Sequence, residues 1–340
     1  MNYTIYLKLT NKCNLKCDHC FNEMMHNHDT MEDGIINRSV QWINDFVHNH
    51  AEDDINCQLF GGEPCLMAPE VLLDVVTRTS ASNVYWSITT NLVYALNDKH
   101  IELFNLMQPY CGRSISMIQT SWDPVIRFKS NHQLTQWEDN VRTLTNNGII
   151  VQPTICLTSA LINEYTPEVI FDYLIEFGIT QINFERLTHT GRAVNQTILV
   201  NKNMIPLIPT NKQIDQWLFE AFKTSKLPEY QHLRFPIFEG VEQSIKGEML
   251  GCRARKCMQT VYTINPDGSI GGCPNTACYA PNNINAIQWV DNKLIKQEQL
   301  RNNNCLICNY YQYCNGDCFQ LKHDHTGCPG MKSIYQYLLG

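Results

Sequence analysis

Three cysteines stand close together near the start of the chain, at Cys13, Cys17 and Cys20 in the stretch LTNKCNLKCDHCFNEM. They directly follow a short apolar run that is expected to be a strand, so their thiolates belong to a loop at the strand's carboxyl end. A structural zinc site normally closes with four protein ligands, whereas three ligands leave one coordination position open. An iron–sulfur cube held by three cysteines likewise keeps one iron free for another molecule. Half of a zinc site and plain core packing are the alternatives for this spacing.

The second expected strand ends in FGGEP, which contains Gly61, Gly62, Glu63 and Pro64. Two glycines let the backbone approach a ligand closely, and the Glu63 carboxylate can receive an ammonium group. Taken alone, the same residues also describe an ordinary turn at the end of a strand. Because the three cysteines follow the preceding strand, the two loops together favour a binding site.

Polar side chains follow later expected strands as well. Thr90 and Asn91 lie in ITTN, Ser121 lies in TSWDP, and Arg127 follows shortly after. Ordinary caps and turns are the alternative for the first three, and a solvated surface arginine is the alternative for Arg127.

A second group of cysteines fills the last part of the chain, where glycine and asparagine are frequent and apolar runs are brief. Such a segment has little core of its own and is expected to need metal to fold. Its pattern is C-x10-G-x4-C followed by C-x2-C-x5-C-x3-C-x9-C. A pair of zinc ribbons would use similar spacings. The cysteines are Cys252, which precedes the pattern, and Cys257, Cys273, Cys305, Cys308, Cys314, Cys318 and Cys328.

The CxxxCxxC stretch with GGEP at the end of the next strand resembles the radical S-adenosylmethionine (SAM) superfamily, and the C-terminal cysteine pattern resembles its SPASM domain. The resemblance covers residues 3–190 and 252–330. It implies SAM and three 4Fe-4S clusters as cofactors, one of them a SAM-binding cluster on Cys13, Cys17 and Cys20. By resemblance, the first auxiliary cluster is held by Cys252, Cys257, Cys273 and Cys318, and the second by Cys305, Cys308, Cys314 and Cys328.

The same resemblance implies contacts to SAM. The GGEP motif, Gly61 to Pro64, would contact the SAM amino group, and His19 would stand where similar enzymes pack an aromatic ring near the adenine. The ribose and carboxylate of SAM would be contacted by Thr90, Asn91, Ser121 and Arg127.

Alternating strands and helices up to about residue 187 predict parallel βαβ units. The expected strands are YTIYLKL, INCQLFG, NVYWSITT, SISMIQT, IIVQPTICL and QINFERL. The fold class is therefore α/β, a partial (β/α)6 TIM-type barrel with a C-terminal cysteine-rich SPASM domain. Glu185 and Arg186 end the sixth strand, where they would face the barrel mouth as a charged pair or form a structural ion pair. The expected units are a barrel at 1–195, a connecting helical segment at 196–250, the SPASM domain at 251–330 and a tail at 331–340.

The chain has 340 residues, with 26 Lys and Arg against 33 Asp and Glu. This mildly acidic balance and the lack of a basic run argue against a nucleic acid partner. A secretion signal and a window of about eighteen apolar residues are both missing, so we expect a cytoplasmic protein without a membrane partner. Its 16 cysteines then favour metal over disulfides, because the cytosol keeps thiols reduced.

The expected function is that of an oxidoreductase, a radical SAM/SPASM peptide maturase. Such an enzyme removes a hydrogen atom from a side-chain carbon of a ribosomally made precursor peptide and forms a carbon–carbon or thioether crosslink. The alternative is an anaerobic sulfatase-maturating enzyme, which forms formylglycine. Those enzymes place an acidic residue just after the cysteine corresponding to Cys273, where this chain has Pro274, although Asp267 or Asp317 could stand in. A non-catalytic iron–sulfur electron-transfer protein is an alternative of another class, and it leaves GGEP unexplained.

The partners implied are a precursor peptide and an external electron donor such as flavodoxin or ferredoxin. The cysteine motif opens about a dozen residues from Met1, which leaves no room for the N-terminal leader-binding domain of several similar maturases. Peptide recognition is therefore expected at the barrel mouth, in the 195–250 segment or on a separate leader-binding protein.

Overall fold

The computed structural model describes residues 2–22, 30–107, 118–189, 191–249, 251–254, 257–274, 303–318 and 320–340. One sheet has the strand order β10-β9-β1-β2-β3-β4-β5-β6, and a separate hairpin pairs β7 with β8. Each of β1 to β6 is parallel to its neighbour, as βαβ units require. These strands are β1 (Asn2–Thr10), β2 (Asp54–Gly61), β3 (Val84–Thr90), β4 (Ile118–Ser121), β5 (Val151–Leu157) and β6 (Asn183–Arg186).

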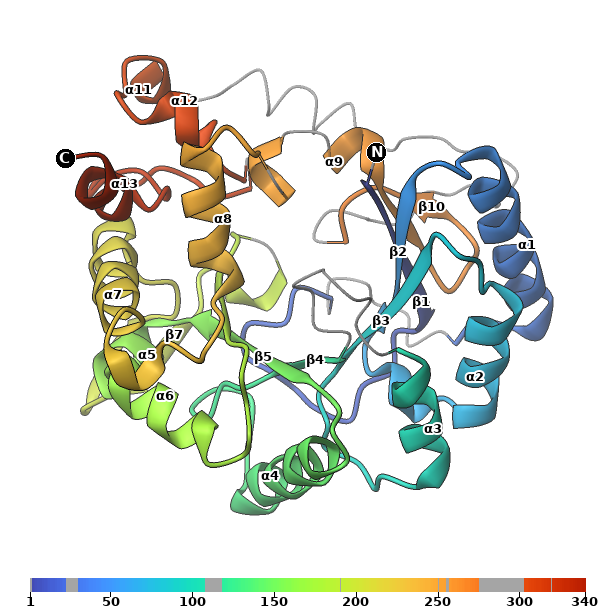
Figure 1. Ribbon diagram of the computed structural model, residues 1–340. Coiled ribbons are helices and arrows are strands. Elements are labelled where there is room, and N and C mark those ends of the chain that lie inside the picture. Colours follow the sequence, from blue (N-terminus) through green and yellow to red (C-terminus); the bar gives the residue numbers. More distant parts are fainter. Residues whose placement is uncertain are drawn as a thin grey trace.

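The helices lie outside the curved sheet (Figure 1). In chain order they include α1 (Asp33–Asn49), α2 (Pro69–Arg78), α3 (Asp98–Leu106), α4 (Asn131–Asn146), α5 (Ser159–Glu164), α6 (Pro167–Ile175), α7 (Asn211–Thr224) and α8 (Pro236–Ile245). β10 and β6 are the two ends of the strand order, so the barrel is open. The predicted α/β partial barrel is confirmed.

The two faces of the strands differ in chemistry, because successive side chains point to opposite sides. Leu7 of β1 is completely buried in the hydrophobic core that also contains residues of the surrounding helices. The other face carries polar groups: Gln58 Nε2 on β2 donates to Thr89 Oγ1 of β3 at 2.6 Å and to Gln119 Oε1 of β4 at 3.0 Å. The interior of the barrel is therefore polar where these three strands meet.

Two helices have clear end signals in the sequence. Helix α6 has Pro167 at its first position and Gly178, with a φ of 74°, shortly after its end, although the Thr166 side chain makes no capping hydrogen bond. Helix α7 begins with a full capping box, because the Thr210 side chain accepts from the Gln213 backbone and the Gln213 side chain accepts from the Thr210 backbone.

The connecting helical segment expected from residue 196 begins instead with a hairpin of β7 (Thr197–Val200) and β8 (Asn203–Pro206). Asn201 and Lys202 both have positive φ, 48° and 67°, as the two turn residues of a type I′ hairpin require. A lysine at the second turn position is unusual there, and it hid the turn from the sequence pattern.

The C-terminal part is built onto the barrel. β9 (Val261–Ile264) pairs in parallel with β1, and β10 (Ile270–Gly271) pairs antiparallel with β9. The last ten residues, expected to be a tail, include helix α13 (Lys332–Leu339), and the Ser333 hydroxyl donates to Asp215 on α7. The short helices of this part are η5 (Gly251–Ala254), α9 (Cys257–Thr260), α11 (Asn303–Leu306) and α12 (Tyr311–Cys314).

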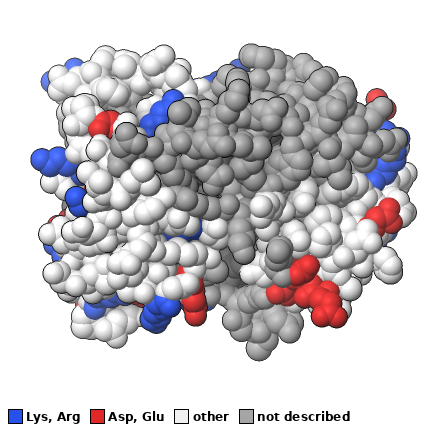
Figure 2. Space-filling model, turned by 90° about the horizontal axis from the view of Figure 1, so that it is seen from above, with Lys and Arg blue, Asp and Glu red and all other residues white. Residues whose placement is uncertain are grey.

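Within the described ranges, every helix is too short or too polar to cross a bilayer. Seen from above, the Lys and Arg side chains of the described residues are scattered over the surface and do not gather into one basic patch on this face (Figure 2).

Replacing Gly62 by alanine should destabilise the protein, because the new Cβ would lie 2.2 Å from the backbone oxygen of Lys12. Backbone must then shift, and we expect a loss of about 2–4 kcal/mol in the free energy of unfolding, measured by urea denaturation. Gly34→Ala in helix α1 is the matched control, since its Cβ meets only the Arg38 side chain at 3.7 Å. Equal stability of the two variants would show that the Gly62 contact is unimportant.

Candidate functional site

The loop that carries the three N-terminal cysteines is held by the GGEP turn. Gly62 N donates to Thr10 O at 2.9 Å, and Glu63 N donates to Lys12 O at 2.8 Å. A Cβ on Gly61, whose φ is 139°, would lie 2.2 Å from Thr10 O. The two glycines therefore permit close approach of two backbone segments, whereas the sequence analysis assigned this freedom to ligand contact.

Glu63 connects the end of β2 to the end of β3. Its buried carboxylate accepts from Thr90 Oγ1 at 2.7 Å, from Asn91 N at 2.6 Å and from Cys65 N at 3.0 Å. Burial raises the pKa of Glu63 to about 7, although these donors act in the opposite direction. The side chain is thus engaged inside the protein, and the predicted contact to an ammonium group stays a prediction.

Asn91 extends this connection to the first cysteine. Its Nδ2 donates to Asn14 Oδ1 at 2.8 Å and lies 3.8 Å from the Cys13 sulfur, and its Oδ1 accepts from Val93 N at 2.8 Å. Leu15 N also donates to the Cys13 sulfur, at 3.4 Å. Cys13 itself is exposed. The end of β3 therefore fixes a thiol that remains accessible.

Cys17 is buried and meets a cation. Arg127 Nη1 donates to the Cys17 sulfur at 3.3 Å, and Arg127 Nε donates to Asp123 Oδ2 at 2.8 Å. Burial raises the pKa of Cys17, and Arg127 opposes this effect. On the far side of the loop, Arg192 N donates to the backbone oxygen of Cys20 at 3.0 Å. All three cysteines of the motif are thus held by other parts of the barrel.

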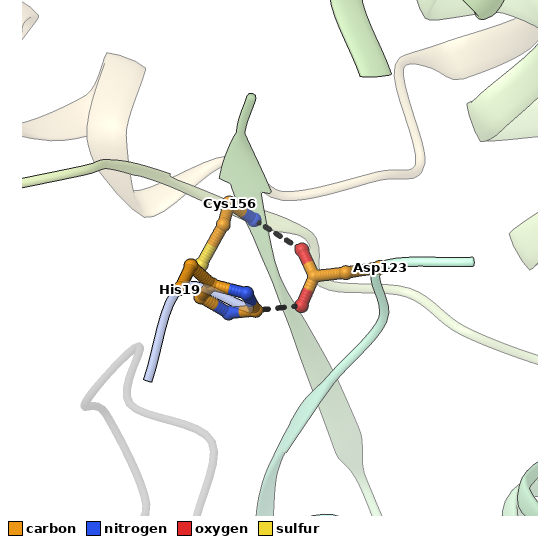
Figure 3. A group of neighbouring side chains, drawn as sticks. All are labelled: His19, Asp123 and Cys156. Carbon is orange, nitrogen blue, oxygen red and sulfur yellow. Dashed lines mark hydrogen bonds and ion pairs between the residues drawn. The ribbon is translucent and has the colours of Figure 1, made fainter. Parts of the chain in front are cut away.

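A buried cluster lies beside this loop and consists of His19, Asp123 and Cys156, whose side chains point toward one another (Figure 3). One ligand atom from each lies within 4.8 Å of the others, as a metal site would require. Arg127 already neutralises Asp123, however, and its Nη2 lies 3.1 Å from His19 Nε2. Burial lowers the pKa of His19 to about 4, so the ring is neutral at pH 7. A further cation would face the guanidinium, and the geometry favours an ion-pair network.

The C-terminal cysteines fall into two neighbourhoods. Cys252 and Cys318 share a hydrogen bond that raises the pKa of Cys252 and lowers that of Cys318, and the Cys273 thiolate adds to the increase at Cys252. Burial raises the pKa of Cys328, and the thiolates of Cys308 and Cys305 add to it.

The sulfurs of Cys314 and Cys328 both flank Gly330, at 3.1 and 3.9 Å from the position of an added Cβ. Cys257 opens helix α9, close in sequence to Cys252 in η5. This grouping agrees with the two predicted ligand sets, which remain predictions. Cys278, a further cysteine near these ligands in sequence, lies outside the described residues.

Glu185 and Arg186 separate instead of forming a charged pair at the barrel mouth. Arg186 Nη2 lies 3.0 Å from Asp317 Oδ2, and its Nη1 donates to Pro329 O at 2.7 Å, so it ties β6 to the C-terminal part. Glu185 lies on the other face of the strand, where it is the register partner of Cys156. Its side chain is accessible to solvent. The protein atoms around it nevertheless desolvate the carboxylate and raise the pKa of Glu185. These two observations fit a carboxylate inside a concave, accessible space.

Comparison with known proteins agrees with this architecture. The family model described as a 4Fe-4S single cluster domain matches residues 4–133. The structure of native anSMEcpe with bound AdoMet and Cp18Cys peptide superposes with a TM-score of 0.76 and 17% identity, covering 100% of this chain and 97% of that one. This chain therefore has the same fold as that protein.

Other relatives are more distant or match in part. SuiB of Streptococcus suis, bound to precursor peptide SuiA, superposes with a TM-score of 0.61 and 14% identity over 94% of this chain and 72% of that one. An uncharacterized protein of Methanocaldococcus jannaschii is 28% identical over 190 residues, which are 54% of this chain and 62% of that protein. The match therefore spans less than two thirds of that relative.

The first cysteine loop fits the three-cysteine cluster that the sequence resemblance implies. Its three thiols are close enough that Cys17 and Cys20 act electrostatically on Cys13, and the sulfurs of Cys13 and Cys17 accept N–H hydrogen bonds, as sulfurs that ligate iron–sulfur clusters commonly do. His19 Nδ1 is buried and has no hydrogen-bond partner in the described part of the chain. Ser121 is half-buried and is the last residue of β4. It therefore lies at the carboxyl end of its strand, as the cysteine loop does after β1.

Sequence reasoning missed several residues of this site. Asp123 was passed over although its position four residues before Arg127 allows an ion pair within one turn. Asn14 and Cys156 gave no signal, because their contacts join positions far apart in the chain. Lys8 is completely buried and donates to Asn22 at 3.0 Å, and its place in an alternating strand was the available clue.

Asn91→Ala should loosen the first cysteine loop. The change leaves Val93 N without its side-chain acceptor and removes the bond from Asn91 to Asn14 Oδ1, and we expect a loss of about 1–3 kcal/mol in unfolding free energy. It should also speed the release of iron to a chelator, followed anaerobically by absorbance. Asn83→Ala is the control, since it removes two side-chain hydrogen bonds, to His50 O and Asp53 O, far from the cysteines. Similar iron release from both variants would contradict a specific role of Asn91.

Proposed function

We propose that this chain is a radical SAM peptide maturase that oxidises a side chain of a ribosomally made precursor peptide and forms a carbon–carbon or thioether crosslink. One observation carries the proposal: the GGEP turn and the end of β3 present an accessible three-cysteine loop at the carboxyl ends of the barrel strands. The anSMEcpe structure holds AdoMet and a peptide, and the SuiB structure holds a precursor peptide, which supports a peptide substrate here.

Cys13, Cys17 and Cys20 would hold the SAM-binding 4Fe-4S cluster, and the eight C-terminal cysteines would hold two auxiliary clusters. When bound, SAM and these clusters would supply hydrogen-atom abstraction from an unactivated carbon and a sink for the remaining electron. Gly61 to Pro64, Thr90, Asn91, Ser121 and His19 are proposed to surround SAM, whereas the Arg127 guanidinium is already engaged by Asp123, Cys17 and His19. Thr90 and Asn91 would influence SAM binding mainly by positioning Glu63 and Cys13, because the Thr90 side chain already contacts Glu63 and the Asn91 side chain contacts Cys13.

The chain's own residues would position the peptide and handle its protons. Among the described strands, Glu185 is the carboxylate on the inner face at the carboxyl end of the barrel. Burial raises the pKa of the neighbouring Tyr6, and the thiolates of Cys273 and Cys252 and the Glu185 carboxylate add to this increase. Glu185 and two cysteines of the first auxiliary ligand set thus lie near the same tyrosine. We assign Glu185 the role of accepting a proton or hydrogen bond from the substrate side chain.

Formation of formylglycine is the second function, and the similarity to anSMEcpe over almost the whole of both chains favours it. The acidic residue expected after Cys273 in that class is replaced by Pro274. Asp317 cannot easily stand in, because it is buried between Arg186 and Arg253 at 3.0 and 3.6 Å. Asp267 accepts from the Ser269 hydroxyl and backbone within its own turn. These contacts make crosslinking the preferred proposal.

The partners proposed are the precursor peptide, an electron donor such as flavodoxin or ferredoxin, and a separate leader-binding protein. The β7–β8 hairpin offers a peptide contact, since Leu199 and Met204 are directly paired across it and both are exposed.

The proposal is tested with anaerobically reconstituted protein, SAM, a reductant and the short peptide encoded nearest its gene, read by mass spectrometry. Crosslinking predicts loss of paired hydrogens from the peptide together with 5′-deoxyadenosine. Replacement of a Cys or Ser side chain by an aldehyde would establish the formylglycine reaction instead. An iron-loaded protein that leaves SAM intact would contradict both.

Glu185→Gln should lower formation of the peptide product without preventing cleavage of SAM. The amide cannot take up a proton, so we expect product formation to fall by roughly 10²-fold while 5′-deoxyadenosine still forms. Product formation by the wild type should rise with pH as the Glu185 carboxyl ionises, above the ordinary range of a glutamate because its pKa is raised. Glu70→Gln on the outer helix α2 is the control. Wild-type product yield from Glu185→Gln would contradict the assigned role.

A further inference from the structure

The guanidinium of Arg127 is directed at protein groups on all three of its nitrogens. Nε donates to Asp123 Oδ2 at 2.8 Å, Nη1 donates to the Cys17 sulfur at 3.3 Å, and Nη2 lies 3.1 Å from His19 Nε2. Its side chain is only 12% exposed. Little of the group is left to meet a bound small molecule.

The partners of Arg127 are themselves fixed. Asp123 is 2% exposed, and its second oxygen accepts from the backbone N–H of Cys156 at 2.8 Å. Because Nη2 of an arginine only donates, His19 Nε2 must be the acceptor, and the ring then carries its proton on Nδ1. The arginine is thereby held in one orientation, with one N–H aimed at a cysteine of the first loop.

We propose that Arg127 is a positioning residue that holds Cys17 and sets the reduction potential of the iron–sulfur cluster on the first cysteine loop. This inference rests on the proposed assignment of Cys13, Cys17 and Cys20 to that cluster. It differs from the role suggested by resemblance, in which Arg127 pairs with the SAM carboxylate.

The physical argument starts from the charge of the ligand sulfur. An N–H donor from a cation draws charge from a thiolate and favours the state of a cluster that carries one more electron. Cys17 is the buried member of the three, so the contact acts in a medium of low dielectric constant, where electrostatic effects are strong. Removing the guanidinium should therefore make the cluster harder to reduce.

A second cation on the same loop offers a matched comparison. Lys129 Nζ lies 2.7 Å from Asp18 Oδ2, next to Cys17 in sequence, but both side chains are close to half exposed. Water and salt screen such a pair. Lys129→Gln thus removes one positive charge near the loop without touching a sulfur.

The experiment compares wild type, Arg127→Gln, Arg127→Lys and Lys129→Gln after anaerobic reconstitution. The readouts are the midpoint potential of the first cluster, followed by electron paramagnetic resonance, and the dissociation constant of SAM. The signal of the first cluster is the one that changes when SAM is added. Arg78→Gln, which breaks an exposed Asp–Arg pair of the same i,i+4 spacing on α2, controls for loss of an ion pair.

We expect Arg127→Gln to shift the potential to a more negative value and to leave SAM affinity within about twofold. Arg127→Lys should recover part of the shift, and Lys129→Gln and Arg78→Gln should show almost none. An unchanged potential with SAM binding weakened about tenfold or more, equivalent to about 1.4 kcal/mol, would overturn the inference and favour a SAM-carboxylate contact.

Two further outcomes separate this inference from the proposed function. A wild-type protein that takes up no iron on the first loop would remove the proposed function itself. If Arg127→Gln loses the first cluster, Arg127→Lys decides the matter. A cluster in that variant with a more negative potential supports the inference, whereas wild-type potential reduces Arg127 to a purely structural role.

Discussion

The backbone contact between the GGEP turn and the loop after β1 is the constraint on which the site depends. Gly61 and Gly62 bring β2 so close to residues 10–12 that no side chain fits between them. Glu63 then turns its carboxylate away from the loop and onto the end of β3. These contacts join three consecutive strands, and the Asn91 amide at the end of β3 contacts the Cys13 sulfur. The strands of the barrel thus hold the cysteine loop in one position.

The barrel divides its chemistry between its two faces. One face of each strand is apolar and packs on helices, whereas the other carries amides, hydroxyls and a few charges that bond to one another across strands. Buried polar groups of this kind are costly unless every partner is present, so they specify one arrangement. Charged residues that point away from the barrel interior make other contacts. Arg186, for example, forms an ion pair with Asp317 in the C-terminal part. The alternation of apolar and polar side chains along the strands therefore determines both how the helices pack and how the polar groups inside the barrel are arranged.

Local patterns made the fold predictable, while contacts between distant segments were beyond reach. The six strands, helix α6 and the capping box of α7 follow from periodicity and end signals within a few residues. The roles of Glu63 and Arg127 depend on which loops meet, and the sequence alone does not record that. The hairpin at β7–β8 was missed for a different reason, because Lys202 adopts a backbone conformation usually reserved for glycine. Resemblance identified the cysteines, and only the structure shows what holds them.

The pairing of β9 with β1 bears on how the protein is made. Thr4 to Leu7 of β1 pair with Val261 to Ile264 of β9, so β1 is synthesised long before this partner. One edge of β1 stays open during that interval, and an unpaired edge is a template for wrong association. Contacts of such long sequence separation also slow folding. The nascent chain therefore carries β1 with one edge unpaired until β9 has been made.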